Sequence, residues 1–377
     1  MSGRGVSRRE LLRLGLGMGG LLPGCAMIPR PAGGGAKKLI QFGFGEPDTA
    51  FMRRHIAQME RSPFDGCVFH LAYKKPDVGH GDFLWETWSR RAFTDAELEP
   101  ALVDLRATTF RRFTHNFLRI CTVPGDVDWF DDFTAILANA NLVARFAREG
   151  RAVGILFDTE QYNAPLFDYR KQRDAGTKSW DVYAAQARRR GREVMDAFQH
   201  GYPDVTILLT FAHSATWRES RGGAKPLAEC EYGLLAPFLD GMLDAAAGDS
   251  RLVDGYELAY FHNKDTAKFA AVRRMIREEL FSIVANPVAY RRRVSVSFGL
   301  WMDYDPTGRD WNGTDGSWNY YTPAEFEASV RAALEAADEY VWIYNQAPRW
   351  WSSEGTPLNL PEGYAEALGR ARQGATR

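Results

Sequence analysis

The sequence lacks the features that define several protein classes. It has only four cysteines in 377 residues and no C-x-x-C pair, so no zinc site built on thiolates is expected. No run of about 18 residues is free of charge, and therefore no membrane span is predicted. The formal net charge of −1 gives no electrostatic footprint for nucleic acid. An apolar fraction of 45% excludes a disordered chain.

Several short motifs of enzymes are also missing. No G-x-G-x-x-G follows the first predicted strand, which disfavours a dinucleotide site. The seven histidines show neither H-x-H nor H-E-x-x-H spacing, so neither a metal nor a cofactor is predicted. The absence of G-x-S-x-G disfavours a serine hydrolase of the α/β type. Cys67, Cys121 and Cys230 are expected to be buried free thiols, with a Cys67–Cys121 disulfide as the alternative.

Residues 1–25 have the layout of an export signal. A basic start containing Arg8 and Arg9 is followed by a Leu- and Gly-rich stretch that ends at Cys25. Residues 7–13 resemble the twin-arginine export motif, and residues 22–25 (LPGC) resemble a bacterial lipobox. These resemblances imply a periplasmic or cell-surface lipoprotein that meets the membrane only through an acylated Cys25. Residues 26–37 are expected to form a flexible tether. An amphipathic N-terminal helix of a cytosolic protein is the alternative.

The rest of the chain, residues 38–377, alternates strand-like and helix-like segments. Eight β-rich runs are bounded by turn signals, namely 39–45, 66–72, 116–122, 152–158, 205–212, 254–261, 293–302 and 340–345. Amphipathic segments lie between them and after the last, namely 48–60, 96–112, 131–149, 180–199, 231–248, 265–285, 323–338 and 361–373. This alternation predicts an α/β fold, a single (β/α)8 TIM barrel with enlarged loops at its C-terminal face. An open doubly wound sheet is the alternative.

Aromatic residues are abundant, at 13% with 11 tryptophans. Most of the tryptophans follow predicted strands, at positions 85, 88, 129, 217, 311, 318, 350 and 351. The loops after the strands form the functional end of a barrel. Indole rings at the rim of a cleft would stack on the apolar faces of sugar rings. The alternative is that the indoles fill small cores within large loops.

Two acids leave the predicted fourth strand together. Period-2 alternation places Gly154, Leu156, Asp158 and Glu160 on one side of that strand. Cleavage of a glycosidic bond needs an acid at the leaving oxygen and a second carboxylate near the anomeric carbon. Asp158 and Glu160 are therefore predicted catalytic residues, with a helix N-cap as the structural alternative for Asp158.

The predicted seventh strand ends in a similar way. The apolar face of residues 293–302 suits the outer helices, which turns Ser297, Trp301 and Asp303 toward the barrel interior. Asp303 is the third predicted catalytic residue. Polar and aromatic residues near the strand ends are predicted to bind substrate, namely His70, Tyr162, His213, Trp217, Glu257, Trp301, Tyr304, Asp305, Trp318 and Asn345. For Asp305, which precedes a proline, the alternative is a turn.

Two segments resemble known families. Residues 158–162 (DTEQY) resemble the end of the chitinase motif D-x-x-D-x-D-x-E, and residues 302–305 (MDYD) resemble the M-x-Y-D segment of the same families. The two earlier acids of the first motif are Val153 and Leu156 here, so the resemblance is to barrel glycosidases as a group. It implies that Glu160 is the general acid and that Asp158 or Asp303 is the nucleophile, base or stabiliser.

The sequence therefore predicts a glycoside hydrolase acting on a polysaccharide or oligosaccharide without a cofactor. A non-catalytic surface lipoprotein that binds glycans on the same rim is one alternative. A polysaccharide lyase on the same barrel is another. The sugar, the linkage, the stereochemical course and the oligomeric state are left open.

Overall fold

The computed structural model describes residues 37–75 and 79–374 and contains a parallel barrel. The strands are β1 (Lys38–Gly43), β2 (Gly66–Phe69), β5 (Phe117–Cys121), β6 (Gly154–Asp158), β7 (Thr206–Leu209), β8 (Arg251–Asp254), β9 (Val294–Val296), β10 (Phe298–Trp301) and β11 (Tyr340–Asn345). Their order in the sheet is β10-β11-β1-β2-β5-β6-β7-β8-β9. Only Ser297 separates β9 from β10, so these two short strands occupy a single strand position of the barrel. Because β9 and β10 are the two ends of the strand order, their continuity brings the ends of the sheet together. The predicted barrel is confirmed.

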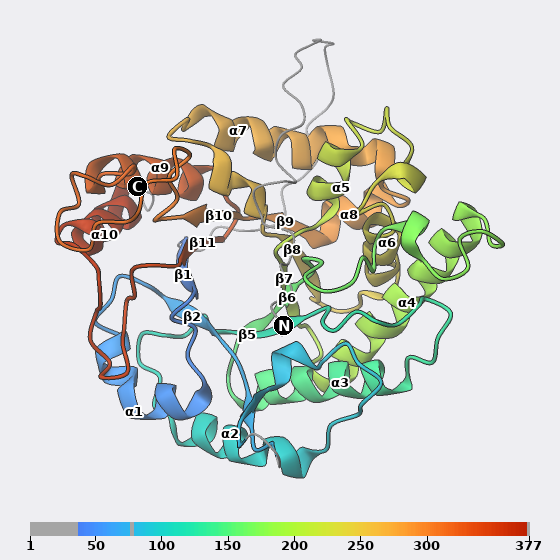
Figure 1. The fold of residues 1–377 in the computed structure, drawn as a ribbon, viewed down its shortest axis with the longest axis horizontal. Helices are drawn as coiled ribbons and strands as arrows, with labels where there is room; N and C mark the ends of the chain where they lie inside the picture. The colour runs from blue at the N-terminus through green and yellow to red at the C-terminus, as the bar shows by residue number, and fades with distance from the viewer. Residues whose placement is uncertain (1–36, 76–78, 375–377) are drawn as a thin grey trace.

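Helices surround the strands in a ring, as Figure 1 shows. They are α1 (Thr49–Met59), α2 (Asp95–Ala107), α3 (Thr134–Glu149), α4 (Trp180–Gly201), α5 (His213–Glu219), α6 (Leu235–Ala245), α7 (Ala267–Arg274), α8 (Pro287–Arg293), α9 (Pro323–Ala336) and α10 (Tyr364–Gly374). Short helical turns include η1 (Phe83–Trp85), η4 (Glu257–Phe261) and η6 (Leu280–Ile283), and β3 (Ala72–Tyr73) pairs with β4 (Gly81–Asp82). Each segment predicted to be helical contains a helix.

Alternating side chains divide the apolar residues into two cores. In β6, Ile155 and Phe157 pack outward against the helices, whereas Leu156 packs inside the barrel. Trp342 fills much of the interior, because Gly299 leaves space for its ring: a Cβ at Gly299 would lie 2.4 Å from the indole. Asp158, which follows Leu156 by two residues, therefore leaves the strand toward the barrel mouth.

The predicted strand over 254–261 is wrong in its position. The strand is β8, which ends at Asp254, and the run Glu257–Phe261 is the helical turn η4. Tyr256 takes a left-handed conformation with φ 36°, and the Asp254 carboxylate accepts a hydrogen bond from its backbone N–H at 3.2 Å. This local turn ends the strand although Tyr256, Tyr260 and Phe261 have high β propensity.

The predicted export signal (1–25) and almost all of the tether (26–37) lie outside the described residues. Within the described part of the chain, no helix is both long and apolar enough to span a bilayer.

Candidate functional site

Asp158 is the last residue of β6, and Glu160 follows it at the C-terminal end of the barrel. Asp158 is 1% exposed and Glu160 is 8% exposed. The backbone N–H of Glu160 donates to Oδ1 of Asp158 at 3.2 Å. A local turn thus joins the backbone of Glu160 to the carboxylate of Asp158 at the end of β6.

The carboxylate of Asp158 is fully engaged. It accepts hydrogen bonds from Arg119 Nη2 at 2.6 Å, from the Tyr162 hydroxyl at 2.8 Å and from Thr210 Oγ1 at 2.9 Å. Burial by itself would raise the pKa of Asp158, but Arg119 and these hydrogen bonds outweigh it and hold the pKa below its ordinary value. Asp158 is therefore a fixed anion rather than a freely moving group.

Arg119 of β5 links Asp158 to a second acid. Its Nη1 donates to Glu46 Oε2 at 2.9 Å, and its guanidinium lies 4.9 Å from the Phe42 ring centroid and 5.3 Å from that of Trp85. Arg119 is not among the site residues predicted from the sequence. Its signal is a lone cation in the apolar run FLRIC, on the opposite face from Leu118 and Ile120.

His70, a predicted substrate-binding residue, joins the same group of charges. Its Nδ1 lies 3.3 Å from Glu46 Oε1, and its Nε2 lies 3.5 Å from Asp82 Oδ1. Burial would lower the pKa of His70, but Asp82 and Glu46 together raise it to about 10. Burial would raise the pKa of Glu46, yet Arg119 and His70 keep it below its ordinary value.

Asp303 holds a loop in place. It accepts hydrogen bonds from Trp301 Nε1 at 3.1 Å, from Gln346 N at 3.0 Å and from Ala347 N at 2.8 Å. Burial raises the pKa of Asp303 despite these donors. The hollow beside it has a volume of about 10 Å³, room for roughly one water. Asp303 thus ties the loop after β11 to the end of β10.

An aromatic cluster covers another part of the mouth. Trp301 contacts Tyr304 at 5.3 Å, Tyr260 at 5.7 Å and Tyr344 at 5.5 Å between ring centroids. Glu257 lies in η4 and is 4% exposed, and its backbone N–H donates to Thr210 O at 3.3 Å. The structure therefore places Trp301, Tyr304 and Glu257 at the barrel end of β7, β8 and β10.

Three predicted binding residues make contacts within the protein. His213 starts α5 and is buried against the Tyr290 ring with its Nε2 3.2 Å from Asp240. Asn345 is fully buried between Gln41, which donates to its Oδ1, and Pro348, whose carbonyl it binds. Asp305 accepts from Thr307 and pairs with Arg309 at 2.9 Å, so the alternative of a turn is correct. Their side chains are engaged in these contacts, and substrate binding by them stays a prediction.

The tryptophans divide into buried and exposed groups. Trp88, Trp129, Trp350 and Trp351 are at most 4% exposed and belong to the hydrophobic core, so the prediction that they lie at an open rim is wrong. Trp217 is half-buried on α5. Trp85 and Trp318 are 40% and 58% exposed. Trp85 lies nearest the acids, since its ring contacts Tyr162 edge-on at 5.7 Å.

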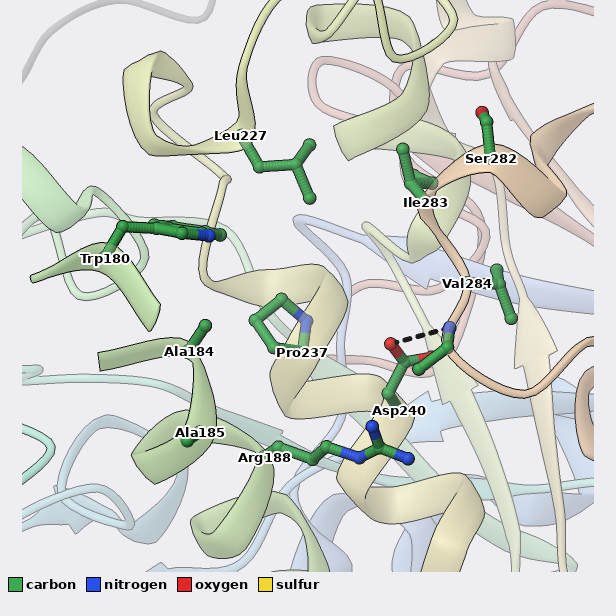
Figure 2. A pocket seen from close by; sticks show the side chains of 11 residues that line it. Trp180, Ala184, Ala185, Arg188, Leu227, Pro237, Asp240, Ser282, Ile283 and Val284 are labelled. Carbon is green, nitrogen blue, oxygen red and sulfur yellow. Dashed lines mark hydrogen bonds between the residues drawn. The ribbon is translucent and has the colours of Figure 1, made fainter. Parts of the chain in front are cut away.

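A larger cavity lies away from the acids, on the helical side of the barrel. Its volume is about 450 Å³, and α4, α6 and the segment after η6 line it. Figure 2 shows Trp180 and Pro237 at this cavity, with Asp240 accepting a hydrogen bond from the backbone of Ala285 at 3.1 Å. None of the predicted site residues lines it.

Within the described part of the chain, no group of three or more His, Cys, Asp or Glu side chains is arranged to hold a metal ion. Cys67, Cys121 and Cys230 are buried free thiols, so the alternative Cys67–Cys121 disulfide is not formed.

Comparison with known proteins gives structural likenesses only. No family model and no curated protein sequence matches the chain. A GH5_18 protein from Streptomyces cattleya, solved in complex with GlcNAc, is similar over 90% of this chain and 81% of its own, with 12% identity and a TM-score of 0.46. A GH5-4 broad specificity endoglucanase from Bacteroides salanitronis is similar over 77% of this chain and 87% of its own, with 13% identity and a TM-score of 0.39. The barrel itself is established by the order of the strands in the sheet.

Proposed function

We propose that the protein is a glycoside hydrolase that cleaves a glycosidic bond in a polysaccharide or oligosaccharide, with Glu160 as the general acid. The observation that carries the proposal is the Asp158–Glu160 pair at the end of β6, in which Asp158 is fixed as an anion by Arg119 at 2.6 Å. A fixed negative charge favours the protonated form of a neighbouring carboxyl group. A protonated carboxyl is the form that a general acid needs.

The chemistry follows from this division of roles. Glu160 donates its proton to the leaving glycosidic oxygen as the bond to the anomeric carbon breaks. Positive charge develops on the sugar ring, and the anion of Asp158 stabilises it. Because Asp158 already accepts three side-chain hydrogen bonds, its role is that of stabiliser and not of nucleophile.

The attacking group is either a water molecule, whose proton passes to Asp303 as general base, or Asp303 itself. Direct attack by water inverts the anomeric configuration, whereas attack by a carboxylate followed by water retains it. The hydrogen bonds from Gln346 and Ala347 to Asp303 favour water. NMR of the first-formed sugar anomer therefore distinguishes the two courses, and inversion is the expected result.

Trp85 is the proposed platform for a sugar ring. Its indole is 40% exposed, and the Tyr162 ring that it contacts carries the hydroxyl bound to Asp158. A sugar stacked on Trp85 would thus lie next to the acids.

The test compares wild type with Glu160→Gln on a panel of polysaccharides and aryl glycosides. Hydrolysis by the wild type and a loss of at least roughly 10²-fold in kcat for the variant are expected, with glycan binding retained. Glu231→Gln is the matched control, since Glu231 is exposed in a nearby loop and its backbone carbonyl accepts from Gln161. Full activity of Glu160→Gln would refute the assignment.

One observation favours a second function, that of a non-catalytic glycan-binding protein. Both Asp158 and Asp303 have their oxygens engaged by donors, an arrangement that suits rigid recognition as well as catalysis. This function predicts glycan affinity without turnover by the wild type, and affinity unchanged in Glu160→Gln. Products that absorb in the ultraviolet through a new double bond would instead indicate a lyase.

We also propose that the protein is exported and anchored through an acylated Cys25. The support is the basic, then apolar pattern of residues 1–25 and the sequence LPGC. Metabolic labelling with a fatty acid is expected to mark the wild type and not Cys25→Ser. Labelling of both would contradict the proposal.

A further inference from the structure

Five charged side chains form a row that alternates in sign and ends at Asp158. The row runs through Asp82, His70, Glu46, Arg119 and Asp158, and the successive contacts are 3.5, 3.3, 2.9 and 2.6 Å. These residues come from β4, from the segments after β2 and β1, from β5 and from β6. A row assembled from five parts of the chain is a property of the folded barrel.

The backbone fixes the position of His70 in this row. Its N–H donates to Pro47 O at 3.1 Å, and it forms a parallel bridge with Asp48. The Asp48 side chain is directed away, because it caps α1 by accepting from Phe51 N at 2.6 Å. His70 therefore faces Glu46 and Asp82 rather than Asp48.

The surroundings of His70 favour its protonated form. Its two ring nitrogens lie at ion-pair distance from two carboxylate oxygens, one of Glu46 and one of Asp82. Two nearby negative charges stabilise the imidazolium over the neutral ring. The side chain of His70 is 15% exposed, so this positive charge lies mostly within the protein.

The row runs from a partly exposed end to a buried end. The exposed fraction of the side chain is 33% at Asp82, 15% at His70, 8% at Glu46, 11% at Arg119 and 1% at Asp158. Coulombic interactions are stronger where water is excluded. Loss of the positive charge on His70 would leave Glu46 dependent on Arg119 alone, and Arg119 would then be less available to Asp158.

We propose that His70 is a positioning residue of the glycosidase site, a permanent imidazolium that holds Glu46 and, through Glu46 and Arg119, keeps Asp158 ionised beside Glu160. The role of Asp158 in stabilising the reacting sugar rests on the proposed function. The existence of the charge row and the positive charge on His70 do not depend on that function.

Other titratable groups also face the row. His80 lies 3.3 Å from Asp82 Oδ1 but is 61% exposed, so solvent screens it. Cys121 Sγ lies 4.0 Å from Asp158 Oδ2, and burial raises its pKa well above the ordinary value. Cys67 behaves in the same way, with the charge of Glu46 adding to the effect of burial. Both thiols therefore stay neutral, and Tyr162 contributes a neutral hydroxyl to Asp158.

The first test measures the protonation state of His70 in the absence of substrate. NMR of protein labelled at histidine follows the imidazole of His70, identified by its absence in His70→Gln. An ordinary histidine loses its proton near pH 6.5. His70 is expected to remain an imidazolium at pH 8, and Asp82→Asn is expected to lower the pH at which it titrates. Deprotonation of His70 near pH 6.5 in the wild type would overturn the proposal.

The second test measures how loss of the His70 charge changes the ionisation of Asp158 during turnover. In His70→Gln, kcat is expected to fall roughly 10-fold with little change in KM, and the acidic limb of the pH profile is expected to move to higher pH. His80→Gln, which alters another neighbour of Asp82, is the matched control and should leave both unchanged. A fall in kcat with an unmoved acidic limb would overturn the proposal, because a merely structural role gives that result.

Two additional experiments apply if a variant does not fold or if the proposed function is wrong. If His70→Gln does not fold, Asp82→Asn should move the acidic limb in the same direction by a smaller amount, and no movement would overturn the proposal. If the wild type hydrolyses no glycoside, the proposed function fails. The charge row is then decided by carbon NMR of the Asp158 carboxyl, whose titration should move to higher pH in His70→Gln.

Discussion

Removal of the Arg119 guanidinium tests how strongly the site depends on its central cation. Arg119→Met keeps an apolar stem of similar length beside Phe42 but leaves Asp158 and Glu46 without their common partner. These carboxylates are 1% and 8% exposed. Breaking a buried ion pair by removal of one partner costs about 3–5 kcal/mol, because the other charge stays buried. At roughly 2 °C per kcal/mol for a protein of this size, Tm should fall by about 6–10 °C.

The pH dependence of the loss has a definite sign. Burial would raise the pKa of Asp158 and of Glu46, but in the wild type Arg119 holds both below their ordinary values. Their contribution to stability is therefore present above about pH 4 and lost as the pH falls through the folded pKa values. In Arg119→Met both groups take up protons more readily, so the Tm difference from wild type should narrow between pH 7 and pH 4.

Thermal unfolding followed by circular dichroism at both pH values measures these effects. Arg53→Met is the matched control, since Arg53 pairs with Asp104 at 2.9 Å with 51% of its side chain exposed. An exposed pair contributes about 0–1 kcal/mol, and the control should lose no more than about 2 °C. A Tm for Arg119→Met within 2 °C of wild type, or an equal deficit at both pH values, would refute the reasoning.

Three further variants separate binding, loop structure and folding. Trp85→Ala should raise KM for an oligosaccharide about 10-fold in steady-state kinetics. Its Tm should change little, since the Trp85 ring is partly exposed. An unchanged KM would show that no sugar stacks on Trp85. Asp303→Ala removes the acceptor of three hydrogen bonds and should lower Tm by roughly 4 °C or more while some turnover survives, whereas complete loss of turnover in a folded variant would make Asp303 the nucleophile. His213→Gln should lower Tm through its contact with Asp240 but leave glycan affinity intact by calorimetry, and weakened affinity would return His213 to the site.

The sequence is sufficient to predict the barrel because local patterns and long-range packing agree in most strands. In β6 the alternation of Leu156 with Ile155 and Phe157 separates the interior from the helical side. The error over 254–261 arose because η4 contains Tyr260 and Phe261, which have high β propensity, while the strand before it is only four residues long. The left-handed Tyr256 leaves no signal in the sequence, since bulky residues rarely take that conformation.

The site is less accessible to sequence reasoning. The Asp158–Glu160 pair follows from spacing along one strand. The row of Arg119, Glu46 and His70 joins neighbouring strands, and its pairings depend on strand order and register. The surroundings of His213 were not predictable either. It follows a strand, but it starts α5, and its Nε2 lies 3.2 Å from Asp240 Oδ1, a partner that is distant in sequence.

The dependence of the Glu160→Gln defect on the leaving group tests the central claim most directly. Two aryl glycosides of the same sugar would be compared, one with a strongly acidic phenol and one with a weakly acidic phenol. Proton donation by a general acid accelerates cleavage little when the departing phenolate is weakly basic. It accelerates cleavage strongly when the departing phenolate is basic. The variant should cleave the first at close to the wild-type rate and the second at least roughly 10²-fold more slowly. An equal defect on both substrates would contradict the role of Glu160 as the proton donor.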